Sequence, residues 1–112
     1  MVSTITDRVN GAVSGVSVAA GAGIIVCSNV SGTDVITATT TPAISGYLNP
    51  SLYLLRPANM NTGPVDANLG AGGLISVLSP SGAELTAGQF DPALEYILRF
   101  NGTEFRIVTP IF

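Results

Sequence analysis

The stretch YILRFNGTEFRIV, residues 96–108, contains the strongest fold signal in this chain. Asn101-Gly102 separates two runs in which apolar and polar residues alternate. The pattern is typical of a β-hairpin, because a type I′ turn requires φ > 0 at both central positions, which Asn and Gly adopt at little cost. A two-residue loop places Arg99 opposite Glu104. One face of the predicted hairpin then carries the side chains that we expect in a core, namely Tyr96, Leu98, Phe100, Phe105 and Ile107.

Weaker β signals precede this hairpin. Short runs rich in β-branched or alternating apolar residues cover positions 24–29, 33–41, 51–56 and 73–78. Prolines recur from residue 42 onward at intervals of about 7–18 residues, which suits short strands and not helices. At most one helical turn is expected, near Asp91–Leu94. We therefore predict an all-β fold, a small β-sandwich or barrel-like domain of short antiparallel strands with a C-terminal type I′ hairpin.

The composition changes along the chain and suggests two parts. Residues 1–23 are rich in Ser, Thr, Val and Gly, and we predict that they form an extended N-terminal arm. Residues 24–112 are predicted to form the β-domain, with its densest part at 47–112. The apolar segment 12–27 contains three glycines and is shorter than the roughly 20 residues that span a bilayer. Because Asp7 cancels Arg8 ahead of it, we predict neither a membrane span nor a signal peptide.

The chain has few charges. Only 10% of its residues are charged, against about 25% in a typical soluble domain, while 46% are hydrophobic. Either partners in an oligomer or a large assembly cover much of the surface, or Ser, Thr, Asn and Gly provide the solvated surface. All four cations are arginines and the net charge is −3, which disfavours nucleic-acid binding through a basic patch.

The residues that catalysis and metal binding usually need are scarce. The sequence contains no histidine, no lysine and one cysteine, and its seven carboxylates form no calcium-loop pattern. A carboxylate pair for glycoside hydrolysis stays open, since such partners can be distant in sequence. We predict no enzyme activity, no catalytic, cofactor-binding or metal-binding residue and no cofactor. Cys27, in the apolar context IIVCS, is predicted to be a small buried hydrophobe. The glycines of residues 70–73 are predicted to form a turn, because no phosphate-loop pattern follows them.

Two segments together resemble virion proteins of tailed bacteriophages. Residues 3–11, STITDRVNG, are similar to the start of many phage tail-fibre and tail-associated proteins. About 60 residues at the C-terminal end resemble β-domains of phage fibre and head-decoration proteins. The resemblance rests on the order of a strand at 53–56, an Asn-Thr-Gly turn at 61–63, a Gly-rich stretch at 69–73, GAELTAG at 82–88, Tyr96, an Asn-Gly-Thr turn at 101–103 and Phe105.

The resemblance implies a homo-oligomer, most often a trimer, with β-domains packed around a symmetry axis and no catalytic residues. Phage fibre relatives commonly continue after the N-terminal motif with a longer β region, and this chain is shorter, which weakens a distal receptor-binding role. A domain of this size is about 25–30 Å across, and an extended arm adds up to about 75 Å, so a long fibre cannot be built from this chain alone.

We therefore expect a capsid decoration (cement) or short head-fibre protein on the phage particle surface, on the head rather than the tail. Its expected partners are other copies of itself and the major capsid protein or another virion protein, with no nucleic acid and no membrane. The expected capsid contacts lie in the arm, at Ser3, Thr4, Ile5, Thr6, Asp7, Arg8 and Val9. The alternatives are a tail-fibre or tail-tip protein that binds a host-surface receptor through loops around 61–73, and a carbohydrate-binding module outside any virus.

Overall fold

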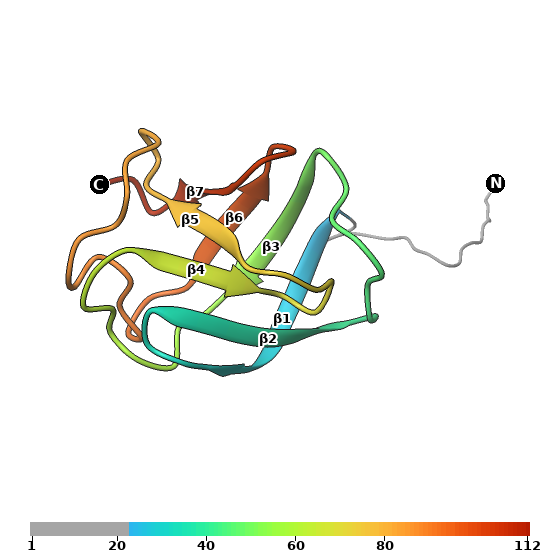
Figure 1. Cartoon of the computed structure of the whole chain (residues 1–112), viewed down its shortest axis with the longest axis horizontal. Helices are drawn as coiled ribbons and strands as arrows, with labels where there is room; N and C mark the ends of the chain where they lie inside the picture. Colours follow the sequence, from blue (N-terminus) through green and yellow to red (C-terminus); the bar gives the residue numbers. More distant parts are fainter. Residues whose placement is uncertain (1–22) are drawn as a thin grey trace, which may run out of the picture.

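The computed structural model describes residues 23–112, which form a closed barrel of seven strands (Figure 1). The strands are β1 (Ile24–Ser31), β2 (Val35–Thr41), β3 (Ser51–Leu55), β4 (Val65–Asn68), β5 (Ile75–Leu78), β6 (Tyr96–Phe100) and β7 (Phe105–Thr109). Around the barrel they follow the order β1-β2-β4-β5-β7-β6-β3. The predicted all-β, barrel-like fold is confirmed, and no helix occurs within residues 23–112.

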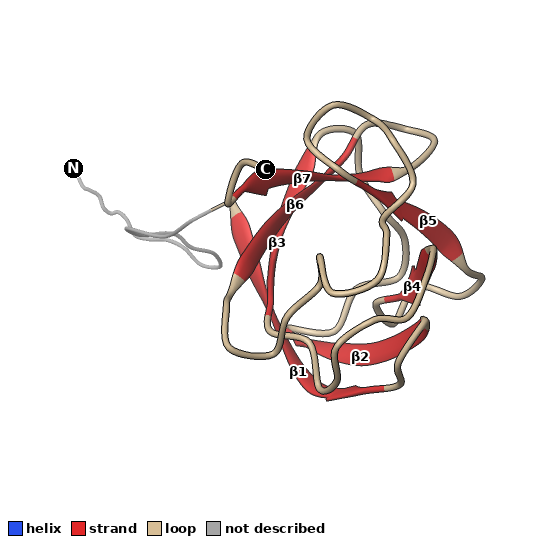
Figure 2. Ribbon diagram, turned by 90° about the vertical axis from the view of Figure 1, so that its left-hand side faces the viewer, coloured by secondary structure: helices blue, strands red, loops and turns tan. Residues whose placement is uncertain are grey.

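Figure 2 looks into the barrel, with the strands arranged around its interior. Their pairing is mixed, both parallel and antiparallel. Four neighbouring pairs are antiparallel, and the pairs β1/β3, β2/β4 and β5/β7 are parallel. The predicted antiparallel pairing is therefore present in four of the seven pairs, and the three parallel pairs were not anticipated. Loops such as residues 42–50, between β2 and β3, are long enough to cross a barrel end and deliver the next strand beside a parallel neighbour. Sequence periodicity defines strands but not their neighbours.

Most predicted strands lie within a few residues of the observed ones. The exception is β4, which the sequence analysis missed, because its four residues VDAN lie between Pro64 and the glycine-rich turn and are too short to show a period. That turn, residues 70–73, lies between β4 and β5 as predicted, with φ > 0 at three of its glycines. Around Asp91 the chain forms a turn, in which the Leu94 amide donates to the Asp91 carbonyl at 3.0 Å.

The C-terminal hairpin is present, but its predicted turn and register are wrong. Phe100 lies opposite Phe105, so the loop contains four residues, 101–104, instead of two. Within this loop only Gly102 has φ > 0, at 100°, which excludes a type I′ turn. The Asn101 side chain closes the loop instead, since its Oδ1 accepts from the amides of Thr103 and Glu104 at 3.0 Å each.

The register shift changes one predicted ion pair and leaves the faces intact. Arg99 lies opposite Arg106, and Glu104 accepts a 2.6 Å hydrogen bond from Arg106 instead of facing Arg99. A slip by two residues preserves the inside–outside alternation of a strand, so the hydrophobic pattern fits both registers equally well. The predicted inward face is confirmed, because all five of its side chains are at most 9% exposed.

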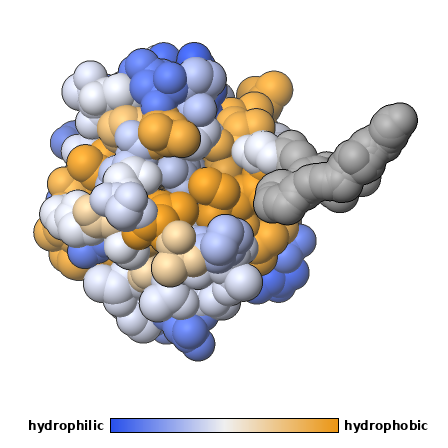
Figure 3. Space-filling view, turned by 90° about the vertical axis from the view of Figure 1, so that its right-hand side faces the viewer, coloured by the Kyte–Doolittle hydropathy of each residue, from blue (hydrophilic) through white to orange (hydrophobic). Residues whose placement is uncertain are grey.

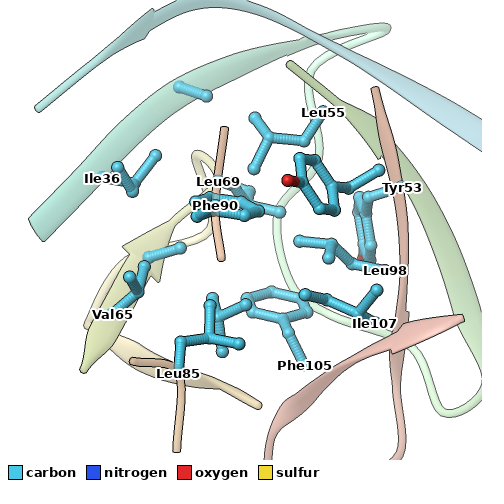
Figure 4. Packing of buried hydrophobic residues seen from close by; sticks show 14 of the residues in the cluster. Ile36, Tyr53, Leu55, Val65, Leu69, Leu85, Phe90, Leu98, Phe105 and Ile107 are labelled. Atoms are coloured by element: carbon cyan, nitrogen blue, oxygen red, sulfur yellow. The ribbon is translucent and has the colours of Figure 1, made fainter. Parts of the chain in front are cut away.

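The core fills the barrel with side chains from every strand or its adjoining loops (Figure 4). Tyr47 contributes to an aromatic group with Tyr53, Phe100 and Phe105, whose ring centroids lie 5.1–6.0 Å apart. Such edge and tilted contacts stabilise aromatic pairs beyond simple burial. The strandless segment 79–95 also contributes Leu85 and Phe90, which are 1% and 0% exposed. The interior is therefore a packed core, and any interaction surface has to lie outside.

Candidate interaction surface

One side of the barrel exterior is unusually apolar. On β1, β3, β6 and β7 the side chains that alternate with the core residues are mostly hydrophobic, although this position normally holds polar residues in a sheet that faces water. We define the apolar face by its six members: Ile24, Val26, Leu52, Leu54, Ile97 and Val108. Figure 3 looks at the barrel end where β1 begins and shows hydrophobic residues at the surface.

Strand register makes the apolar face continuous. Val26 lies opposite Leu54, which lies opposite Ile97, so three apolar side chains form a row across β1, β3 and β6. Ile24 and Leu52 form the beginning of a second row, which continues to Arg99. Cross-strand neighbours of this kind are about 5 Å apart and contact each other. Val26 is nonetheless 51% exposed, so the described residues leave part of the face open.

The other side of the barrel exterior is polar. Outward positions on β2, β4 and β5 are mainly Thr, Asp, Asn and Ser, and we call Thr37, Thr39, Thr41, Asp66, Asn68 and Ser76 the polar face. Their hydroxyls bond to neighbouring strands, as in the 2.8 Å contact between Ser31 Oγ and Thr37 Oγ1. This face resembles a solvated surface, and the contrast makes the apolar face the stronger candidate for contact with another protein.

Charged groups border the apolar face. The exposed Glu95 directly precedes β6, and Arg99 follows Ile97 on the outward side of that strand. Glu95 lies 4.0 Å from Arg56 in an exposed pair, which contributes little to stability. Arg99 is exposed, lies opposite Arg106 and forms no ion pair with another described residue. Arg106 is already bound to Glu104, so among the described residues Arg99 is the exposed cation at this border that can form an ion pair with another chain.

Two polar clusters, one buried around Asn61 and one exposed between Thr62 and Asp34, hold loops in place. The side chain of Asn61, 2% exposed, donates to the carbonyls of Gly63 and Thr86 and accepts from the amide of Phe90 at 2.8–2.9 Å. At the next residue of this loop, the amide and hydroxyl of Thr62 donate to the carboxylate of Asp34, in the turn before β2, at 2.8 and 2.5 Å. These hydrogen bonds lower the pKa of Asp34. Because every polar atom of the Asn61 side chain is used within the fold, that cluster is structural.

An apolar depression of about 340 Å³ lies near the C-terminus. Leu94, Tyr96 and residues 110–112 line it. The Tyr96 hydroxyl donates to the Gln89 carbonyl and accepts from the Asp91 amide, both at 2.8 Å, so it is not available to a ligand. Gln89 and Asp91 also line the depression, and one oxygen of each side chain accepts a hydrogen bond from a backbone amide of the fold, so few polar atoms are free to orient a small molecule.

Cys27, predicted to be a small buried hydrophobe, is only half-buried and packs against the core from β1. Burial raises the pKa of its thiol to about 11, which disfavours the reactive thiolate. Within residues 23–112, no group of three or more His, Cys, Asp or Glu side chains is placed to hold a metal ion. The same part of the chain contains no helix that is long and apolar enough to cross a membrane.

The predicted site residues fall into two groups, one outside the part of the chain that the structure describes and one in the hairpin loop. Ser3, Thr4, Ile5, Thr6, Asp7, Arg8 and Val9 lie outside the described residues. Asn101 and Gly102 form the hairpin loop, where their role is structural. Sequence reasoning missed the apolar face, although IIV at 24–26 and LYLL at 52–55 are apolar at inward and outward positions alike, which is the signal that could have identified it. No protein-family model matches the chain, and no similar curated protein was found.

Proposed function

We propose that this chain is a non-enzymatic structural protein of a tailed-bacteriophage virion, a capsid decoration (cement) or short head-fibre protein that acts as a homo-oligomer. The observation that carries the proposal is the apolar face on a small barrel with few charges. A free protein would expose this face to water, whereas an assembly covers it and gains the free energy of its burial. The resemblance of residues 3–11 and of the C-terminal half to phage proteins supports the particular assembly.

The proposed capsid contact is the N-terminal segment that directly precedes β1. Residues 3–9 contain one acidic and one basic side chain and several β-branched residues, a composition that suits pairing with the edge of a sheet in another protein. In this mode backbone hydrogen bonds supply much of the affinity. Several such arms joined in one oligomer bind with avidity, so each contact can be weak.

Imaging intact particles tests the location. Antibodies raised against the purified chain are bound to phage virions and viewed by electron microscopy. Label over the whole head is the expected result. Label at the tail end alone would replace this proposal with the tail-fibre or tail-tip alternative and direct attention to a host-surface receptor. Particles without label would refute a virion role.

A deletion tests the arm. Removal of residues 2–20 is expected to leave a folded oligomer that no longer sediments with capsids. The matched control keeps the length and replaces residues 3–9 by a Gly/Ser linker, which separates the sequence of the contact from the length of the chain. Full-strength capsid binding by both variants would contradict an arm contact.

A further inference from the structure

We propose that the apolar face is the contact between copies of this chain, with Arg99 of one copy placed against Glu95 of the next. The inference rests on the homo-oligomer of the proposed function and adds which surface forms it. It assigns capsid binding and self-association to different parts of the molecule.

The first support is the distribution of apolar side chains. The row Val26–Leu54–Ile97 is continuous across three strands, and Glu95 and Arg99 flank its Ile97 end. Val26 on β1 and Val108 on β7 are 51% and 45% exposed, while Leu54 and Ile97 between them are half-buried, so the two outer strands of the face are open to water within the described structure. An apolar centre with charges at its rim is the usual anatomy of a protein–protein interface.

The second support is the order of charges along β6. Ile97 and Arg99 point outward from β6, and the exposed Glu95 directly precedes the strand, so a negative group, an apolar residue and a positive group follow one another along this edge of the face. Glu95 and Arg99 are separated by about 13 Å, the length of four residues of strand. A second copy related by a two-fold axis at Ile97, or a neighbour in a head-to-tail ring, brings each Arg99 to a partner's Glu95. The face is complementary to itself, which favours another copy over a different protein.

The third support is the surroundings of Arg99. Two arginines that face each other across β6 and β7 repel, and Glu104 compensates only Arg106. A carboxylate from a neighbouring copy would supply the missing anion beside Arg99. Glu95 can serve, because its bond to Arg56 within the chain is long, at 4.0 Å, and exposed.

A matched pair of variants tests the face. Val26 and Val35 are both outward valines on strands, 51% and 53% exposed, but Val26 belongs to the apolar face and Val35 lies on β2, whose other outward residues belong to the polar face. Sedimentation velocity of the full chain gives the dissociation constant of the oligomer. Val26→Lys is expected to raise it at least about tenfold, and Val35→Lys, with the same change of charge, to leave it within about threefold. Equal effects, or a wild-type monomer at 50 µM or more, would overturn the proposal.

Charge reversal tests whether Arg99 of one copy contacts Glu95 of the next. This second experiment does not depend on the folding of Val26→Lys. Arg99→Glu alone and Glu95→Arg alone are each expected to weaken the oligomer about tenfold or more, and the double variant to recover most of the loss. Circular dichroism checks that each variant is folded. A double variant as weak as the sum of its singles would refute the Arg99–Glu95 contact. Head labelling of virions is measured separately, so failure of the interface and failure of the virion role give different results.

Discussion

Replacing Asn61 by alanine should destabilise the barrel strongly, although this residue belongs to no strand. Its side chain joins three backbone groups from segments far apart in sequence, the carbonyls of Gly63 and Thr86 and the amide of Phe90. Its own backbone also bonds to the segment around Gly88 and Phe90. Asn61 thus fixes segment 86–90, and Phe90 at 0% exposure is part of the core.

The magnitude follows from what alanine would leave unpaired. The Phe90 amide is buried, and loss of its acceptor costs about 1–3 kcal/mol. The Gly63 and Thr86 carbonyls are partly buried and can recover bonds to water, so each costs about 0.5–1 kcal/mol. The free energy of unfolding of Asn61→Ala should fall by about 2–5 kcal/mol, which lowers the Tm of a domain of this size by about 10 °C or more.

Urea and thermal unfolding at one fixed protein concentration measure this change, since association also shifts the Tm. Asn59→Ala is the control, because Asn59 is exposed and makes a single 3.2 Å bond to the Gly32 carbonyl. It should cost less than about 1 kcal/mol. A loss below about 1 kcal/mol for Asn61→Ala would refute the inference that the Asn61 side chain fixes segment 86–90.

Asn61→Asp adds a pH test of the same cluster. Burial beside two carbonyls raises the pKa of the new carboxyl above its unfolded value, so the destabilisation is present at pH 7 and should diminish as pH falls toward 4. Stability that is unchanged over this range would show that the introduced group does not lie in the cluster.

Three further predictions concern the hairpin, a loop contact and the thiol. Gly102→Ala should lower the free energy of unfolding by about 1–2 kcal/mol, because φ is 100° and the new Cβ would lie 3.0 Å from Asn49 Nδ2. The control Gly46→Ala places its Cβ in open space and should change stability by less than about 0.5 kcal/mol. Equal Tm values for the two variants would contradict the assigned loop. The pKa of Asp34 is lowered in the folded state, so the stabilisation it provides is present above its ordinary pKa of 3.8 and is lost as pH falls through and below that value. Urea titrations should give wild type a larger free energy of unfolding than Asp34→Ala at pH 6, and the two values should converge near pH 3. Because burial raises the pKa of Cys27 from 9.0 to about 11, its alkylation by iodoacetamide at pH 8 should be on the order of 100-fold slower in the native protein than in urea, and equal rates would contradict its burial.

Much of the fold could be predicted from local residue chemistry. The period-2 alternation in residues 96–108 determined which side chains of β6 and β7 face the core, and turn residues located the ends of most strands. These inferences hold because burial preference and backbone permissiveness are properties of individual residues and their near neighbours.

Only the tertiary structure decided which strands are neighbours and where the apolar residues gather. The hairpin register differs by two residues from the predicted one because both registers bury the same side chains, and the Asn101 side chain selects the longer loop. Barrel closure joins β1, β3 and β6, so Val26, Leu54 and Ile97, separated by up to 71 positions, become one row. Such long-range contacts depend on the path of the chain as a whole, and short segments of sequence contain no information about that path.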